Sequence, residues 1–195
     1  MMKISRKQLS RSAIMILVFL WSVTLSPSAG FVSGAREFTS AAQLPRTLSF
    51  PAAALSHNPS NDIIKDDTNG LRWQFNFRES AGLLVRRPYD YAGGDVTFRI
   101  FFQTTTPATG LVQFFIRPRS LDPGDGLFDA ASITSGPVIV TGTSGFGTMY
   151  EQTIIIPANR LTKDWWFITI QRQGSMSTYS DDVVVFGVAL EYLAL

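Results

Sequence analysis

Apolar and polar side chains alternate with a period of two through most of the chain after residue 45. The clearest example is segment 95–103, DVTFRIFFQ, whose apolar positions on one face are Val96, Phe98, Ile100 and Phe102. This alternation is typical of strands that bury one face of a sheet. The same pattern predicts further strands at 47–52, 71–77, 82–87, 111–117, 137–142, 149–156, 165–172 and 182–195.

Clusters rich in Gly, Pro, Asn and Asp separate these segments, as tight turns require. No segment after the first 35 residues shows a convincing 3.6-residue apolar repeat. Eight or nine strands with short turns and no crossover helices predict an all-β protein. We expect a single antiparallel β-sandwich of the jelly-roll type over residues 46–195, preceded by an extended N-terminal arm at 36–45.

The last predicted strand differs from the others, because nearly every position of segment 182–195 is apolar. A strand that is buried on both faces produces such a run. It lies either inside the sandwich or at a subunit interface, and we favour the interior.

The N-terminus has the features of a secretory signal peptide. Basic residues without acids precede an apolar run from Ala13 to Leu25, and small residues follow. The run is shorter than the roughly 20 residues of a membrane span, so we expect cleavage of a leader at 1–35 and no stable membrane anchor. Gly30 and Ala35 are the candidate cleavage positions. We therefore expect a protein that is secreted or lies at the cell surface, with the periplasm as an alternative.

Loss of that leader changes the charge of the protein. The full chain has 17 basic and 15 acidic residues, and four basic ones lie before residue 36, so a mature chain has 13 against 15. We therefore expect no nucleic-acid binding, which needs clustered positive charge. The chain has no cysteine and one histidine, which disfavours disulfides, thiol chemistry and a Ser-His-Asp triad.

The segment RPYDYAGGD, residues 87–95, combines two tyrosines and an aspartate with a Gly-Gly pair. Tyr89, Tyr91 and Asp90 could form an aromatic platform with a carboxylate that binds a sugar ring. In the alternative interpretation, which we favour, the segment is a corner between strands where a tyrosine hydroxyl bonds to the backbone.

The succession VRRPYDYAGGDVTFRIFF (85–102), TGLVQFF (109–115), DPGD (122–125), IQR (170–172) and DVVVFGVALEY (182–192) is similar to a loose class of uncharacterised bacterial and phage β-sandwich domains. These domains are of structural or surface type. The resemblance covers about residues 70–195 and assigns no catalytic residue. A signal peptide departs from a virion role and favours a secreted or surface protein.

Aromatic residues also occur at outward positions of predicted strands. Alternation places one of Trp165 and Trp166 in the core and the other outside, where it could stack on a sugar or anchor an interface. Phe101 and Phe115 fall on the polar faces of their strands. Either self-association or a ligand groove would explain these positions.

An acidic loop, SLDPGDGLFDAAS, brings three aspartates within eight residues: Asp122, Asp125 and Asp129. Carboxylates on a short turning segment are ligands that calcium prefers, so the loop is a candidate calcium site. It lacks the residue order of an EF-hand, and we favour a solvated turn. No other cofactor is expected.

These features favour a secreted, non-catalytic β-sandwich protein that acts in extracellular assembly or adhesion, as a homo-oligomer or larger assembly. The alternative is a carbohydrate-binding module whose outward aromatics hold a glycan. A glycan-cleaving enzyme is a third hypothesis, but the spacing of the acidic residues singles out no catalytic pair.

Overall fold

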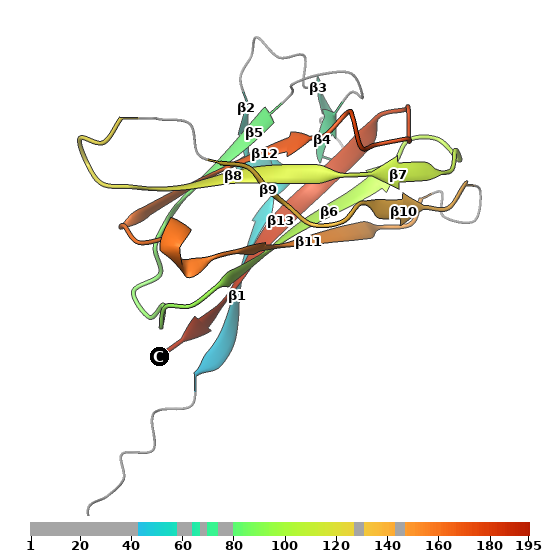
Figure 1. Ribbon diagram of the computed structural model, residues 1–195. Coiled ribbons are helices and arrows are strands. Elements are labelled where there is room, and N and C mark those ends of the chain that lie inside the picture. The colour runs from blue at the N-terminus through green and yellow to red at the C-terminus, as the bar shows by residue number, and fades with distance from the viewer. Residues whose placement is uncertain (1–42, 58–63, 67–69, 74–79, 127–130, 143–146) are drawn as a thin grey trace, which may run out of the picture. The chain divides into compact units, whose positions relative to one another are not determined.

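The computed structural model describes residues 43–57, 64–66, 70–73, 80–126, 131–142 and 147–195 (Figure 1). The chain divides into two compact units, Met1–Thr39 and Ser40–Leu195, and all described residues belong to the second. The predicted leader at 1–35 lies outside the described residues. Residues 36–42 of the predicted arm also lie outside them. The last two residues of the arm, 44 and 45, already belong to the first strand, which begins at Leu44.

Two antiparallel sheets make up this unit, with one short additional strand pair. The six-stranded sheet contains β11 (Tyr150–Ile156), β6 (Val96–Thr104), β13 (Val183–Ala194), β4 (Gly70–Trp73) and β3 (Ile64–Asp66) in that order, and β1 (Leu44–Pro51) also pairs with β13. The five-stranded sheet has the order β2 (Ser56–His57), β5 (Ser80–Arg86), β12 (Trp165–Arg172), β8 (Phe114–Leu121) and β9 (Ile133–Thr134). The additional pair is β7 (Gly110–Val112) with β10 (Val138–Val140), and two 3-10 turns are η1 (Ala52–Ala54) and η2 (Ala158–Arg160).

The strand pairs are nested in the order of the chain. The first long strand pairs with the last (β1 with β13), β5 pairs with β12, β6 pairs with β11, and β8 pairs with β9. The long strands alternate between the two sheets along the chain, in the order β1, β5, β6, β8, β11, β12 and β13. The sheets are completed by β6 against β13 and β8 against β12. This is the jelly-roll arrangement, so the predicted all-β antiparallel sandwich is confirmed.

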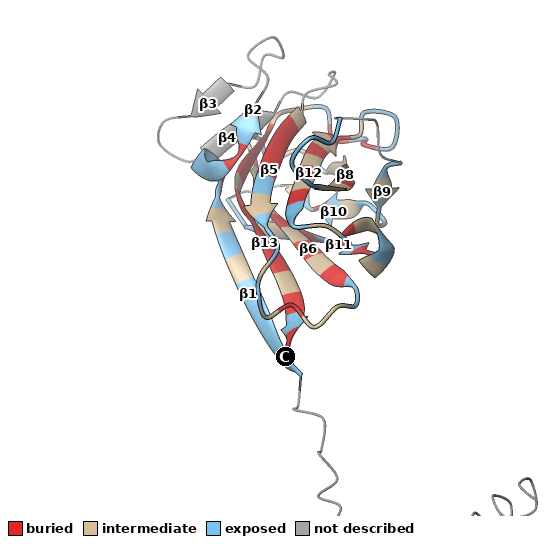
Figure 2. Cartoon of the chain, turned by 90° about the vertical axis from the view of Figure 1, so that its left-hand side faces the viewer, coloured by how far each residue is buried: buried red, intermediate tan, exposed pale blue. Residues whose placement is uncertain are grey.

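The core lies between the two sheets. The inward residues of β6, predicted from its alternation, are Val96, Phe98, Ile100 and Phe102, and all are fully buried. Phe102 meets Phe114 of the opposite sheet edge-on, with ring centroids 5.3 Å apart. Figure 2 shows the alternation of buried and exposed positions along the strands. Without disulfides, this apolar contact provides most of the stability.

Strand β13 is buried over most of both of its faces. It lies between β6 on one side and β1 and β4 on the other. Its outward residues Val184 and Ala189 are covered by neighbouring parts of this chain and are 8% and 2% exposed. Most of the apolar run is therefore explained within the sandwich, while Leu193 and Leu195 at its end are exposed.

A buried glutamine links the two sheets. Gln152 of β11 points inward, where its side-chain oxygen accepts from the backbone N–H of Phe114 (2.8 Å). Its amide nitrogen donates to the carbonyl of the same residue (3.0 Å). The side chain thus pairs with the backbone of β8 as a neighbouring strand would, which fixes β11 against the start of β8.

Arg172, the last residue of β12, is buried at 1% exposure. Its terminal nitrogens donate to the carbonyls of Asp181 (2.7 Å) and Tyr179 (2.6 Å), and so hold the segment between β12 and β13. From the sequence we expect the guanidinium groups of strand arginines to lie in water or in ion pairs. Arg172 departs from this expectation, because the loop that follows β12 folds back and supplies carbonyl acceptors in the interior.

We expect Arg172→Ala to lower the free energy of unfolding by about 3 kcal/mol or more, because two carbonyls lose their donor and a cavity remains. Urea unfolding followed by circular dichroism measures this loss. The matched control is Arg86→Ala, at an exposed position, which should change stability by less than about 0.5 kcal/mol. A loss below about 1 kcal/mol for Arg172→Ala would contradict its role in holding the loop.

Candidate functional site

The corner segment 87–95 is fastened by Tyr91. Its ring is 9% exposed and packs edge-on against Trp166, with centroids 5.1 Å apart. Its hydroxyl donates to the backbone carbonyl of Gly94, and its backbone bridges Ala194 at the end of β13. Gly94 has a φ of 93°, which a residue with a side chain rarely adopts. This is the arrangement that the corner interpretation expects, and it leaves Tyr91 no surface for stacking on a sugar.

Asp90 is bound by groups of this chain. Its carboxylate accepts from the Tyr192 hydroxyl (3.0 Å) and forms an ion pair with Arg46 of β1 (3.1 Å). Asp90 therefore joins the corner to β13 and β1. Tyr89 differs from its neighbours, since it is 96% exposed and has no role in fastening the corner. The predicted platform of Tyr89, Asp90 and Tyr91 is thus not assembled in this structure.

The two adjacent tryptophans point to opposite sides of β12, as alternation predicts. Trp166 is fully buried and lies against Tyr91 in the core, so it cannot contact an external ligand. Trp165 is 38% exposed on the outer face of the five-stranded sheet. The prediction of a sugar-stacking tryptophan therefore rests on Trp165.

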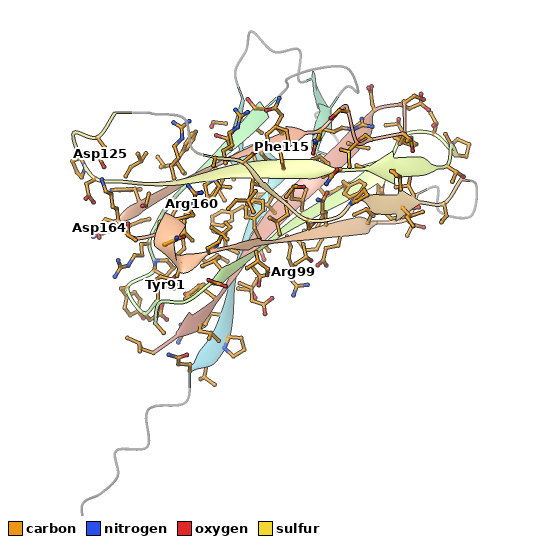
Figure 3. The ribbon with its side chains drawn as sticks, viewed as in Figure 1. Tyr91, Arg99, Phe115, Asp125, Arg160 and Asp164 are labelled. Carbon is orange, nitrogen blue, oxygen red and sulfur yellow. The ribbon has the colours of Figure 1, made fainter. Side chains whose placement is uncertain are left out.

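Trp165 belongs to a larger exposed set, which we call the aromatic–arginine face. Its members are outward residues of the three central strands of the five-stranded sheet. Register places Trp165 between Arg86 and Leu121, and Phe167 between Leu84 and Arg119. Figure 3 shows Phe115, a further member, on the outer side of β8. The face consists of Leu84, Arg86, Phe115, Arg117, Arg119, Leu121, Trp165 and Phe167.

The ring of Phe167 lies over the neighbouring strand β5 because Gly82 of that strand has no side chain. A Cβ at Gly82 would come within 2.8 Å of the Phe167 ring and within 3.0 Å of the Ser56 hydroxyl. The missing side chain therefore leaves the space that the ring occupies over β5. Arg117 is positioned in a similar way, with its guanidinium carbon 5.3 Å from the Phe115 ring centroid. These contacts give the face a fixed surface of rings and cations.

Phe167 and Arg119 are not among the residues that the sequence predicts for a site. Phe167 follows Trp165 by two positions, so alternation alone could have placed it on the same face. The position of Arg119 opposite Phe167 depends on the register of β8 against β12, which the sequence does not reveal.

The outer face of the six-stranded sheet has a different chemistry. Arg99 of β6 donates to Glu151 and Glu191, each at 2.7 Å, and these hydrogen bonds raise the pKa of Arg99. In Figure 3, Arg99 and Phe115 lie on opposite sides of the sandwich. The charge of Arg99 is therefore neutralised by the chain itself.

The predicted calcium loop contains a lysine contact. Lys163 donates to Asp125, and its Nζ lies 4.0 Å from an oxygen of Asp122. The hydrogen bond from Lys163 lowers the pKa of Asp125. Asp129, the third predicted ligand, lies outside the described residues. Within the described ranges, no group of three His, Cys, Asp or Glu side chains could hold a metal ion.

We expect calcium to leave the thermal stability of the protein unchanged, because an ion at Asp122 and Asp125 would have to displace the Lys163 ammonium. Thermal unfolding with 5 mM calcium chloride, and with a chelator as the control, measures this. An increase in Tm above about 2 °C with calcium alone would contradict the expectation.

A second prediction concerns alkaline pH. Burial, followed by the hydrogen bond to Asp90, raises the pKa of Tyr192 above its usual value of 10.0, and burial also raises that of Tyr91. A phenol whose pKa is higher in the folded state contributes stability below its unfolded pKa and loses it as the pH rises through the folded pKa. We therefore expect Tm to fall above about pH 10.

Tyr192→Phe removes one of these groups, so its Tm should fall less steeply than that of the wild type between pH 9 and pH 11.5. At pH 8 the variant should be less stable by about 1–2 kcal/mol, because Asp90 loses a donor. Equal slopes for the two proteins would exclude this role of Tyr192.

Comparison with known proteins yields a likeness at the level of the fold. No protein-family model and no curated protein matches the chain. Among solved structures it resembles a xylan-binding module of family CBM15, at 13% identity over 76% of this chain and 97% of that one (TM-score 0.47). It also resembles a CBM22 xylan-binding domain from Paenibacillus barcinonensis, at 12% identity over 79% and 98% of the two chains (TM-score 0.43).

A CBM36 module in complex with calcium and xylotriose is similar at 12% identity over 74% of this chain and 98% of that one, with a TM-score of 0.40. These low values support no conclusion about the ligand of this chain. They also leave untested the resemblance to bacterial and phage surface domains. Within the part of the chain that the structure describes, no helix is long and apolar enough to cross a membrane.

Proposed function

We propose that the protein is an extracellular, non-catalytic glycan-binding domain whose ligand lies on the aromatic–arginine face. One observation carries the proposal. Trp165, at 38% exposure, and the partly exposed Phe167 follow each other on the outer face of a central strand, with arginines on both neighbouring strands.

The chemistry of this face suits a sugar. An aromatic ring offers a flat apolar surface to the C–H groups of a pyranose, while the hydroxyls at the edge of the sugar need hydrogen-bond partners. Arg86 lies beside Trp165 on β5, and Arg119 lies beside Phe167 on β8. A guanidinium carries five N–H donors, so the exposed Arg86 offers donors beside the ring of Trp165.

The same face is less suited to a second copy of this chain. In a symmetric dimer the contact surface is shared by both subunits, so Arg86 and Arg117 of one copy would lie in the same contact as those of the other. Like charges across an interface oppose association. The assembly hypothesis also rests on the apolar last strand, and most of β13 is already covered within the sandwich.

A non-catalytic role is supported by the engagement of several acidic side chains. Among the described residues, Glu151 and Glu191 are held by Arg99, and Asp90 is held by Tyr192. Asp181 accepts from Thr106. A glycosidase needs two available carboxylates on either side of a bound sugar. Export of the domain rests on the predicted signal peptide at 1–35.

We expect Trp165→Ala to weaken binding to the preferred polysaccharide at least tenfold, equivalent to about 1.4 kcal/mol, because the stacking surface is lost. Affinity electrophoresis in gels that contain xylan, mannan, β-glucan, pectin or alginate identifies the polysaccharide and measures the change. Trp165→Phe keeps an aromatic ring and should retain more binding than the alanine variant.

Leu193→Ala is the matched control, since Leu193 is 40% exposed on β13 of the other sheet. It should migrate as the wild type does in every gel. Retardation of the wild type that Trp165→Ala leaves unchanged would refute this site, and no retardation in any gel would refute glycan binding by this domain.

A further inference from the structure

We propose that the glycan is a linear chain that lies lengthwise along β12, from the ring of Trp165 to a second point of contact at Gln171 and Phe115. This inference rests on the proposed function and names the class of its ligand. That class is a segment of several sugar units within a linear polysaccharide, as opposed to a single sugar or a disaccharide.

The outward side chains of β12 form a continuous strip. They are Trp165, Phe167, Thr169 and Gln171, since alternate residues of a strand point to the same face. Trp165 is exposed and the other three are partly exposed, whereas the residues between them are buried. Residues two apart on a strand lie about 6.7 Å apart, so the strip is about 20 Å long. A ligand that contacts all of it must contain several sugar rings.

The shape of the sheet favours this direction over one that crosses the strands. Among the described residues, the sheet beside Trp165 consists of β5, β12 and β8. Strands β2 and β9 join it only near the other end of β12. Neighbouring strands lie about 4.8 Å apart, so β5 and β8 are separated by about 10 Å, half the length of the strip. A linear chain therefore gains more contact when it lies along β12.

The ring of Phe167 connects the two halves of the strip. Register places Gly82 opposite Thr169, one step along β12 from Phe167. The Phe167 ring occupies the space over Gly82, where a Cβ would come within 2.8 Å of it. The ring therefore extends from its own position toward Thr169, so the apolar surface that begins at Trp165 continues to the middle of the strip.

The far end of the strip offers a different set of contacts. Thr169 carries a hydroxyl and Gln171 an amide, and both groups donate and accept hydrogen bonds, as the hydroxyls of a sugar do. Phe115 lies directly opposite Gln171 on β8, and the guanidinium of Arg117 holds its ring. In Figure 3, Phe115 lies far from Asp164, the residue before Trp165. A glycan that reaches this end gains contacts that a sugar bound at Trp165 alone does not make.

The test measures affinity against the length of the glycan. The probes are linear xylo-, manno-, gluco-, galacturono- and alginate oligosaccharides of two, four and six units, and isothermal titration calorimetry of the wild type gives the affinities. In the series that binds, the hexasaccharide should bind at least tenfold more tightly than the disaccharide. The reason is that only the longer chains span the distance from Trp165 to Gln171.

Two variants assign the effect of length to the far end of the strip. Gln171→Ala and Phe115→Ala should each weaken binding of the hexasaccharide about threefold or more and leave that of the disaccharide unchanged. Trp165→Ala should weaken binding of both. Gln103→Ala is the matched control, since Gln103 is a partly exposed glutamine on β6 of the other sheet, and it should bind every probe as the wild type does. A folding defect in one far-end variant, seen as a lower Tm, still leaves the other as a test.

The outcomes separate this inference from the proposed function. A disaccharide that binds as tightly as its hexasaccharide would overturn the lengthwise ligand while glycan binding stands. Wild-type affinity for the hexasaccharide in both Gln171→Ala and Phe115→Ala would also overturn it, because the chain would then leave β12. So would binding of a polysaccharide whose own hexasaccharide does not bind. Binding of no oligosaccharide and no polysaccharide would overturn both proposals.

Discussion

The jelly roll depends on the pairing of its first strand with its last. Strand β13 contacts β6 along one edge, and β4 and then β1 along the other, so it connects the two ends of the described chain. Where it passes from β4 to β1, its register against β6 shifts between Val185 and Gly187. A Cβ at Gly187 would lie 2.5 Å from the Phe50 carbonyl, so glycine permits this close approach of β1. In a chain without cysteine, such contacts take the place of a covalent closure.

The two sheets that this pairing holds together have different outer surfaces. The six-stranded sheet contains the closing strand, and its exposed Arg99 is neutralised by glutamates of β11 and β13. The five-stranded sheet has β12 between β5 and β8, and Trp165, Phe167 and the arginines lie on its outside. The corner at Tyr91 connects the layers, since its ring meets Trp166 from one sheet and Tyr192 from the other. Function is therefore expected on a sheet face and not at this corner.

Much of the fold could be predicted from alternation alone, because period-two patterns reveal a strand and its buried phase. Segment 165–172 is predicted with the same bounds as β12, and the inward residues of β6 are predicted correctly. Alternation could not decide which face of β12 is buried, since Trp165 and Phe167 are as apolar as Trp166 and Ile168. Arg172 and Gln152 occupy inward positions that only their backbone partners explain. The sequence predicts only Trp165 and Phe115 of the candidate face, for a related reason: the face combines three strands that are distant in the chain, and its other members depend on their register.

Nuclear magnetic resonance titration of the isotope-labelled protein tests the location of the ligand most directly. The probe is a tetrasaccharide cut from whichever polysaccharide the wild type binds best, and the signals are the backbone amides and the tryptophan indole N–H groups. We predict that the largest shift changes fall on the Trp165 indole and on the amides of β12, β5 and β8, with little change on β1, β6 and β11. Shift changes concentrated around Arg99 on the six-stranded sheet, or at the corner near Tyr89, would contradict the assignment of the aromatic–arginine face.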